Sequence, residues 1–290
     1  MKWDYHFGVN KPYQEVEDGF VPALRDFYEN PDKYAIAPFQ IFGNLWYVGD
    51  QKVTSHLIDT GDGLILFDTG YGHTTHMMLS SIRGAGFDPM DIKIIIHSHG
   101  HFDHFGSGEE LRKLTGAKVY MSGVDTRLLR EKEARALMAW GPCPEDPICW
   151  PDVLIEDGDH VVLGNTDIHC VLSAGHTAGT MSYFFDVTDG QKVLRAGYFG
   201  GTGMLGVYQA FCRKFDLPLD LCAQMKQTIR KLRDYKVDIM LGNHPAQNRT
   251  LEKRAYMLET GENPFLDSNA WIEFLTALEE RRQDFEDRGY

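Results

Sequence analysis

The chain lacks any apolar run long enough to cross a bilayer, although hydrophobic residues make up 43% of its 290 residues. A membrane-spanning helix needs about 20 consecutive apolar residues, so a helical membrane protein is excluded. The first residues, Met1 to His6, also lack the basic region and the apolar core that mark a signal peptide. We therefore expect a cytoplasmic protein that does not act at a membrane.

Cysteine is scarce and follows no disulfide framework. The chain has five cysteines, an odd number with irregular spacing, and this favours a reducing compartment. Cys143 and Cys149 flank a stretch with two prolines, and the gap between them fits no common zinc spacing. Two free thiols in a proline-rich loop are the preferred interpretation, and a metal or redox pair is the alternative.

Basic residues are too few for a protein that binds nucleic acid. Acidic residues outnumber basic ones 42 to 29, which gives a net charge of −13. Nucleic-acid binding requires Lys and Arg patches that neutralise phosphates. The short basic stretch at 230–233 lies in a helical pattern and fits a solvated helix face. The charge balance therefore argues against a nucleic-acid partner and favours a small-molecule substrate.

One segment concentrates side chains that can bind metal. Four of them fall within six residues, directly after the apolar, β-branched run 94–96: His99, His101, Asp103 and His104. A buried strand that ends in such a loop can aim several side chains at one point. Imidazole and carboxylate ligands suit zinc, or failing that iron or manganese, better than calcium or magnesium. The sequence therefore predicts a metal site.

The pattern His99-x-His101-x-Asp103-His104 resembles the signature of the metallo-β-lactamase superfamily of dinuclear metallohydrolases. Two later segments resemble further ligand loops of that family. They are Gly175-His176-Thr177 and the apolar strand that runs into His244-Pro245. The runs 39–49 and 64–70 are similar to the opening of the third subclass of zinc β-lactamases (B3).

The resemblance implies two zinc ions per chain, each with three ligands. The first set would be His99, His101 and His176, and the second Asp103, His104 and His244. Two cations that share a water lower its pKa towards neutrality, which supplies a bridging hydroxide without a dedicated protein base. Asp103 would be catalytic, because it would orient this water as well as bind metal. Asp68 would form hydrogen bonds beneath the metal site, or else serve as a turn-forming residue before Thr69-Gly70.

The same resemblance implies an α+β fold, the αββα four-layer sandwich, as a single domain over 1–290 with an N-terminal extension at 1–37. The pattern of strands followed by helices, twice over, agrees with this fold. Antiparallel strands linked by hairpins are expected between 39 and 68. Further strands are expected at 92–96, 117–121, 153–156, 160–163, 167–173, 181–187, 192–197 and 237–241. Helices are expected at 19–30, 73–85, 107–115, 125–140, 217–235 and 269–282.

The glycine-rich segment 197–206 is the candidate substrate surface, because glycine lets backbone approach a ligand closely. We expect Tyr198 or Thr202 to contact substrate, and a flexible surface turn is the alternative. A substrate carboxylate could be held by Thr202, by glycine amides or by Arg213. In many superfamily hydrolases of thioesters, lactones and phosphodiesters, an acidic residue in this region bridges both metals, and this chain has none there.

The leading hypothesis is therefore a B3-like zinc hydrolase that opens β-lactams or a related cyclic amide or ester. The alternative is an intracellular lactonase or thioesterase of the same fold without β-lactamase activity. A metal-dependent oxidoreductase would need a flavin module that the sequence lacks. A non-enzymatic binding protein is disfavoured by the complete ligand set.

Overall fold

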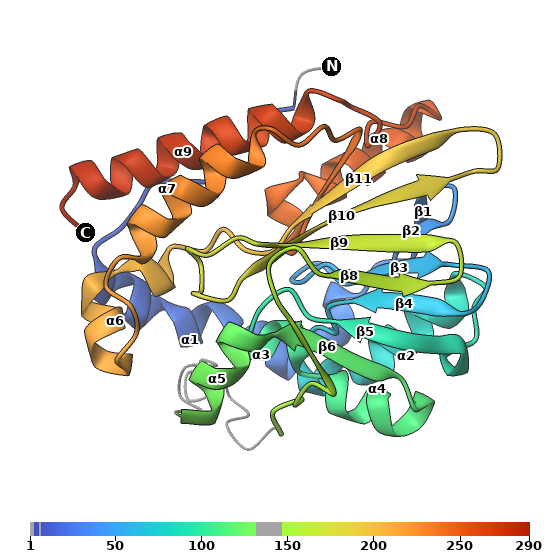
Figure 1. Ribbon diagram of the computed structural model, residues 1–290, viewed down its shortest axis with the longest axis horizontal. Helices are drawn as coiled ribbons and strands as arrows, with labels where there is room; N and C mark the ends of the chain where they lie inside the picture. Colours follow the sequence, from blue (N-terminus) through green and yellow to red (C-terminus); the bar gives the residue numbers. More distant parts are fainter. Residues whose placement is uncertain (1–2, 6, 132–146) are drawn as a thin grey trace.

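Two β-sheets pack face to face with helices on both outer sides (Figure 1), in a computed structural model that describes residues 3–5, 7–131 and 147–290. This arrangement confirms the expected α+β sandwich of four layers. The remaining part of the helix expected at 125–140, and Cys143, lie outside the described residues. In the described part of the chain, no helix is long and apolar enough to span a membrane.

The first sheet has seven strands in sequence order, and its parallel half positions the metal-binding motif. The strands are β1 (Phe39–Phe42), β2 (Leu45–Tyr47), β3 (His56–Asp59), β4 (Leu64–Phe67), β5 (Ile92–Ile96), β6 (Lys118–Ser122) and β7 (Val153–Ile155). Strands β1 to β4 pair antiparallel, as expected for the hairpins between 39 and 68. Strands β4 to β7 pair parallel. The loops after β4 and β5 therefore leave from the same edge of the sheet.

The second sheet has five strands in the order β12-β11-β10-β9-β8. Their bounds are β8 (His160–Leu163), β9 (Thr166–Leu172), β10 (Met181–Thr188), β11 (Val193–Phe199) and β12 (Ile239–Gly242). Strands β11 and β12 are parallel, and Phe199 pairs with Gly242 at their ends. The glycine-rich segment and the loop that carries His244 consequently start side by side.

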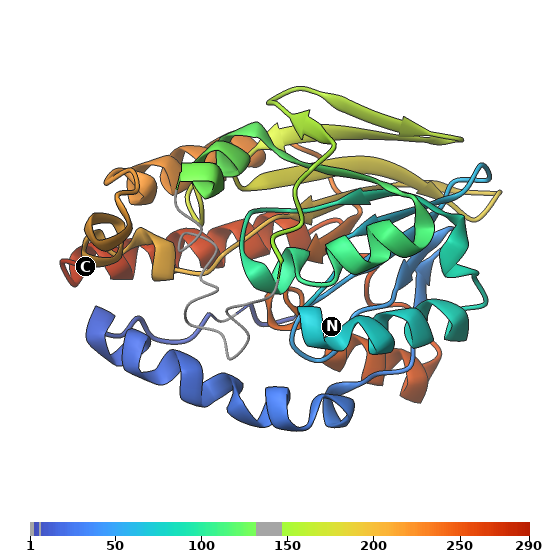
Figure 2. The ribbon, with the colours of Figure 1, turned by 90° about the horizontal axis from the view of Figure 1, so that it is seen from below.

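Helices cover the outer face of each sheet (Figures 1 and 2). On the side of the first sheet lie α1 (Tyr13–Glu29), α2 (Thr75–Gly84), α3 (Phe102–Phe105), α4 (Gly108–Thr115) and α5 (Gly123–Glu131). On the side of the second sheet lie α7 (Leu221–Leu232), α8 (Thr250–Thr260) and α9 (Ala270–Asp287). The short helix α6 (Gln209–Phe215) lies near the amino end of α1.

Several helix boundaries differ from the sequence prediction. Helix α1 begins six residues before the expected position 19 and continues through Pro22. Its partly buried apolar residues, and Phe27 in the core, pack against the body and offset the poor helix propensity of glycine and proline. Helix α7 begins at Leu221 rather than at 217, because Pro218 disfavours helical backbone at the residue before it. Helices α6 and α8 were not predicted.

The core between the sheets is apolar and aromatic. Phe67 of the first sheet stacks on Phe185 and Tyr198 of the second, with ring centroids 5.4 Å apart in both pairs. The N-terminal extension packs into the outer core, since Phe27 is fully buried and its ring lies 4.9 Å from that of Tyr71. The described part of the N-terminal extension therefore packs on the same body as the sandwich.

Candidate metal centre

Three segments at one end of the sandwich bring the six predicted ligands together. His99 and His101 follow β5, and Asp103 and His104 lie on the short helix α3. His176 lies between β9 and β10, and His244 follows β12. The ligand atoms form two groups of three, which are His99, His101 and His176, and Asp103, His104 and His244. Within each group the ligand atoms lie within 4.8 Å of one another.

The first group has the geometry of a three-histidine metal site. His99 Nε2 lies 3.0 Å from His101 Nδ1 and 3.0 Å from His176 Nε2. Tetrahedral zinc with bonds of about 2.0–2.1 Å places its ligand atoms roughly 3.3 Å apart. The three nitrogens are therefore spaced to share one cation, and three protein ligands leave a fourth position for water or substrate.

The second group combines two imidazoles with one carboxylate. His104 Nε2 lies 3.2 Å from His244 Nε2, and Asp103 Oδ2 lies 3.4 Å and 3.6 Å from these two nitrogens. Nitrogen and oxygen donors without any cysteine suit zinc, and also iron or manganese. The residues present therefore fit a second cation beside the first.

The outward ring nitrogens of three ligands donate to fixed oxygen acceptors. His176 Nδ1 donates to the Gly203 carbonyl at 2.7 Å, and His244 Nδ1 donates to the Lys52 carbonyl at 2.8 Å. His104 Nδ1 donates to Asp68 Oδ2 at 2.7 Å. Because a carbonyl or a carboxylate can accept but not donate, each ring carries its proton on Nδ1 and turns the Nε2 lone pair inward.

Burial keeps most of these imidazoles neutral at physiological pH. It lowers the pKa of His176 to about 4, and it lowers the pKa values of His99 and His101 well below the ordinary value. A neutral imidazole is the form that binds metal. Burial alone would raise the pKa of Asp103, but the neighbouring His104 lowers it overall, so the carboxylate is ionised. The three histidines of the first group are therefore in the protonation state that a cation requires. In the second group, burial alone would lower the pKa of His104, but Asp103 and Asp68 raise it to about 10, so His104 must give up a proton when a cation binds.

Asp68 lies beneath the second group and joins both parts of the centre. It is fully buried, with a left-handed φ of 50°, because the chain turns sharply after β4. Its carboxylate accepts hydrogen bonds from the Ser98 amide and hydroxyl, both at 2.7 Å, as well as from His104. The Ser98 hydroxyl lies 3.0 Å from His99 Nδ1 and can accept its proton. Asp68 therefore both forms the turn after β4 and accepts a hydrogen bond from His104 of the second group. From the sequence alone, these two roles are alternatives.

Tyr198 does not face a substrate, and the prediction that it contacts one is wrong. Its side chain is fully buried between the sheets, because it points inward from β11. Its hydroxyl donates to Asp68 Oδ2 at 2.5 Å. Tyr198 thus supports the carboxylate that orients His104.

Replacing Tyr198 by phenylalanine should lower the free energy of unfolding by about 1.5–3 kcal/mol, because a hydrogen bond to a buried charge is lost. KM should stay unchanged. Tyr183→Phe is the matched control, since this equally buried tyrosine donates to the neutral His97 carbonyl at 2.9 Å and should cost about 0.5–1.5 kcal/mol. Denaturant unfolding and steady-state kinetics measure both variants. A several-fold rise in KM with unchanged stability for Tyr198→Phe would restore it as a substrate residue.

The glycine-rich segment borders the first ligand group, and Gly201, Gly203 and Gly206 lie directly against His176. A Cβ at Gly201 would lie 2.4 Å from His176 Cδ2, so no larger residue fits without moving the ring. The Gly203 carbonyl holds the same histidine. Thr202 between them is 4% exposed, and Arg213 is exposed and donates to Gln209 Oε1 at 2.7 Å. The segment thus holds His176, a candidate metal ligand, in place. It is not the flexible surface turn that is the alternative interpretation of the sequence.

Asp125 ties two ligand loops together and was missed from the sequence. It is buried in the first turn of α5. Its carboxylate accepts hydrogen bonds at 2.8 Å from the Gly100 amide, the Thr177 hydroxyl and the Gly179 amide. Gly100 lies between His99 and His101, and Thr177 follows His176. In the sequence, an aspartate in the first turn of a helix is an ordinary feature, so no signal marked it.

Asp125→Ala should weaken binding of the first cation by about 10–100-fold, the usual effect of removing a group that orients metal ligands. Asp125→Asn should be milder, because one oxygen still accepts hydrogen bonds. Competition with a chromophoric chelator measures the affinity of each site. Equal affinities for the alanine variant and the wild type would show that the loops hold their geometry without Asp125.

Asn243 makes a similar link between two further segments of the centre. Its Nδ2 donates to the Gly200 carbonyl at 2.6 Å, and its backbone amide donates to Gln247 Oε1 at 3.0 Å. This contact joins the loop of His244 to the glycine-rich segment that holds His176. The two ligand groups are consequently braced against each other.

The sandwich fold and the two ligand groups together define a metallohydrolase. Residues 48–200, more than half of the chain, match the family model of the metallo-β-lactamase superfamily. The chain therefore belongs to the metallo-β-lactamase superfamily.

A solved structure and two curated proteins illustrate the relationship. The chain superposes with a TM-score of 0.75 on BJP-1, a subclass B3 metallo-β-lactamase of Bradyrhizobium japonicum, at 29% identity over 88% of this chain and 94% of that one. The expected resemblance to subclass B3 is confirmed. An uncharacterized Aquifex aeolicus protein is 27% identical over 49% of this chain and 63% of its own length. PksB of Bacillus subtilis, named a probable polyketide biosynthesis zinc-dependent hydrolase, is 28% identical over 33% of this chain and 35% of its own length.

Proposed function

We propose that the chain is a dinuclear zinc hydrolase that opens β-lactams or a related cyclic amide or ester. The observation that carries this proposal is the pair of three-ligand groups at one end of the sandwich, both with rings already oriented. The overall similarity to a subclass B3 enzyme supports it. Two zinc ions bound there would acidify a water molecule and polarise the substrate carbonyl.

The residues of the protein would bind the two ions and orient the attacking water. His99, His101 and His176 would bind the first ion and leave one position open. Asp103, His104 and His244 would bind the second ion. Asp103 has a second carboxylate oxygen, which we propose orients the attacking water by accepting one of its protons in a hydrogen bond. Asp68 keeps the His104 ring in its protonated-Nδ1 tautomer, so that His104 Nε2 stays available.

The alternative is a lactonase or thioesterase of the same fold without β-lactamase activity. PksB, which is named a probable polyketide biosynthesis zinc-dependent hydrolase, supports this alternative. The ligand sets favour the first candidate, because the segment 197–203 has no acidic residue that could bridge two metals. A panel of nitrocefin, an acyl-homoserine lactone and a thioester, assayed with added zinc, separates the two. Hydrolysis of the lactone or the thioester without hydrolysis of nitrocefin would favour the alternative.

Purified protein dialysed against buffer with zinc should contain two zinc ions per chain. Two groups of three ligands provide two sites of similar donor chemistry. Elemental analysis together with a protein assay gives the ratio. A ratio that settles at one, even with excess zinc, would defeat the dinuclear proposal.

A further inference from the structure

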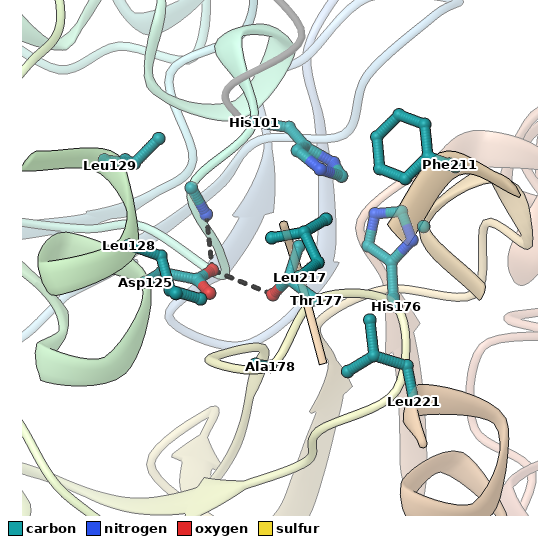
Figure 3. A pocket seen from close by; sticks show the side chains of 12 residues that line it. His101, Asp125, Leu128, Leu129, His176, Thr177, Ala178, Phe211, Leu217 and Leu221 are labelled. Carbon is teal, nitrogen blue, oxygen red and sulfur yellow. Dashed lines mark hydrogen bonds between the residues drawn. The ribbon is translucent and has the colours of Figure 1, made fainter. Parts of the chain in front are cut away.

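An apolar pocket opens beside the first ligand group (Figure 3). It lies between α5 on one side and α6, α7 and the segment that joins them on the other. We call it the leucine pocket, and its apolar side chains are Leu128, Leu129, Phe211, Leu217 and Leu221. His101 and His176 form part of the same wall, so anything bound in the pocket adjoins the first metal site.

Among the described residues, the lining of the leucine pocket offers no basic side chain to an anionic occupant. Among the described residues that line it, none is Lys or Arg, and Asp125 is the acidic one. The Asp125 carboxylate already accepts three hydrogen bonds, so it offers little to a ligand. Away from the metal centre, a carboxylate on the substrate would meet no Lys or Arg side chain among the described lining residues and would lie beside the acidic Asp125. The exposed Arg213, two residues after Phe211 on α6, pairs with Gln209.

We propose that the substrate carries an uncharged apolar substituent, an aliphatic chain, that binds in the leucine pocket while its carbonyl lies at the metal centre. This inference rests on the proposed function and narrows its substrate class. The preferred substrates are neutral cyclic esters or amides with an alkyl chain, rather than compounds with a carboxylate on that side. Apolar walls contribute affinity in proportion to the apolar area that they remove from water.

The size of the effect follows from the burial of methylene groups. Each buried methylene contributes about 0.8 kcal/mol, which corresponds to a roughly fourfold rise in kcat/KM. The rise should continue until the pocket is full and then stop. A carboxylate at the end of the same chain should cancel the gain.

The test uses zinc-loaded protein and a series of neutral lactones whose alkyl substituent grows by one methylene at a time. The expected result is a stepwise rise in kcat/KM with chain length, and this dependence on chain length is lost in Leu217→Lys. Leu217 suits this change because it is half-buried rather than in the core. Leu219→Lys is the matched control, since Leu219 is 51% exposed and does not line the pocket. A flat series, or equal rates for chains that end in a carboxylate, would overturn the proposal.

A binding measurement keeps the inference testable if no lactone is hydrolysed. Linear alcohols from butanol to octanol should raise the melting temperature of the wild type increasingly with length, and should not do so for Leu217→Lys. Length-dependent binding without any hydrolysis, including of nitrocefin, would show that the pocket is correct and the proposed function is not. Hydrolysis without length-dependent binding would show that the proposed function is correct and that the leucine pocket does not bind the alkyl chain.

Discussion

Replacing Asp103 by asparagine is expected to lower kcat by on the order of 10²–10⁴-fold while the protein stays folded. The carboxylate completes the second ligand group, because its Oδ2 lies 3.4 Å from His104 Nε2 and 3.6 Å from His244 Nε2. An amide has nearly the same size but no negative charge, so it binds a divalent cation weakly and cannot orient an attacking water in the same way. Steady-state kinetics on the best substrate of the panel gives kcat and KM, and circular dichroism checks the fold.

Asp91→Asn is the matched control for this change. Asp91 is exposed in a short 3₁₀ turn before β5, away from the ligands, and its substitution should leave kcat within twofold. The zinc content of Asp103→Asn should fall towards one ion per chain. Near-wild-type turnover of Asp103→Asn on any substrate would show that this carboxylate neither binds metal nor orients water.

Removal of one histidine from either group is expected to lower the zinc content by one ion per chain. His176→Ala removes a ligand of the first group, and His244→Ala removes a ligand of the second. Each substitution leaves two ligands in its own group and three in the other, so one site should empty after dialysis and the other should stay filled. The double variant should therefore contain no zinc. Hydrolysis should be lost in all three proteins, since the proposed reaction needs both ions.

Elemental analysis of the dialysed variants measures this directly. His169→Ala is the control, because His169 is half-buried on β9 and stacks on His160 with ring centroids 5.0 Å apart, outside both groups. It should retain two zinc ions. If either single substitution removed both ions, the two groups would form one inseparable site, and the assignment of three ligands to each would be wrong.

The ligands could be predicted from the sequence because their spacing is local. His99, His101, Asp103 and His104 follow one strand, and an apolar run that ends in a loop of metal-binding side chains is readable without any tertiary contact. His176 and His244 followed from the resemblance of their own short loops to a known family. The αββα sandwich followed from the same resemblance together with the order of strands and helices.

Helix boundaries were less predictable, because tertiary packing overrides local propensity. Helix α1 continues through Gly19 and Pro22 since its apolar residues pack against the body. The short helix α6 is too short for a periodic pattern to stand out, yet Phe211 and Phe215 bury it.

What the sequence by itself determined is the set of six candidate ligands and the fold class, because motif and strand order are properties of the chain alone. The tertiary structure decided how those ligands are held. Tyr198 supports Asp68 from a strand 130 residues away, and Asp125 joins loops separated by 77 residues between His99 and His176. Such contacts depend on which face of β11 points inward and where α5 lies against the ligand loops. Spacing along the chain carries no information about either, because sheet pairing and helix packing place these residues together only after folding.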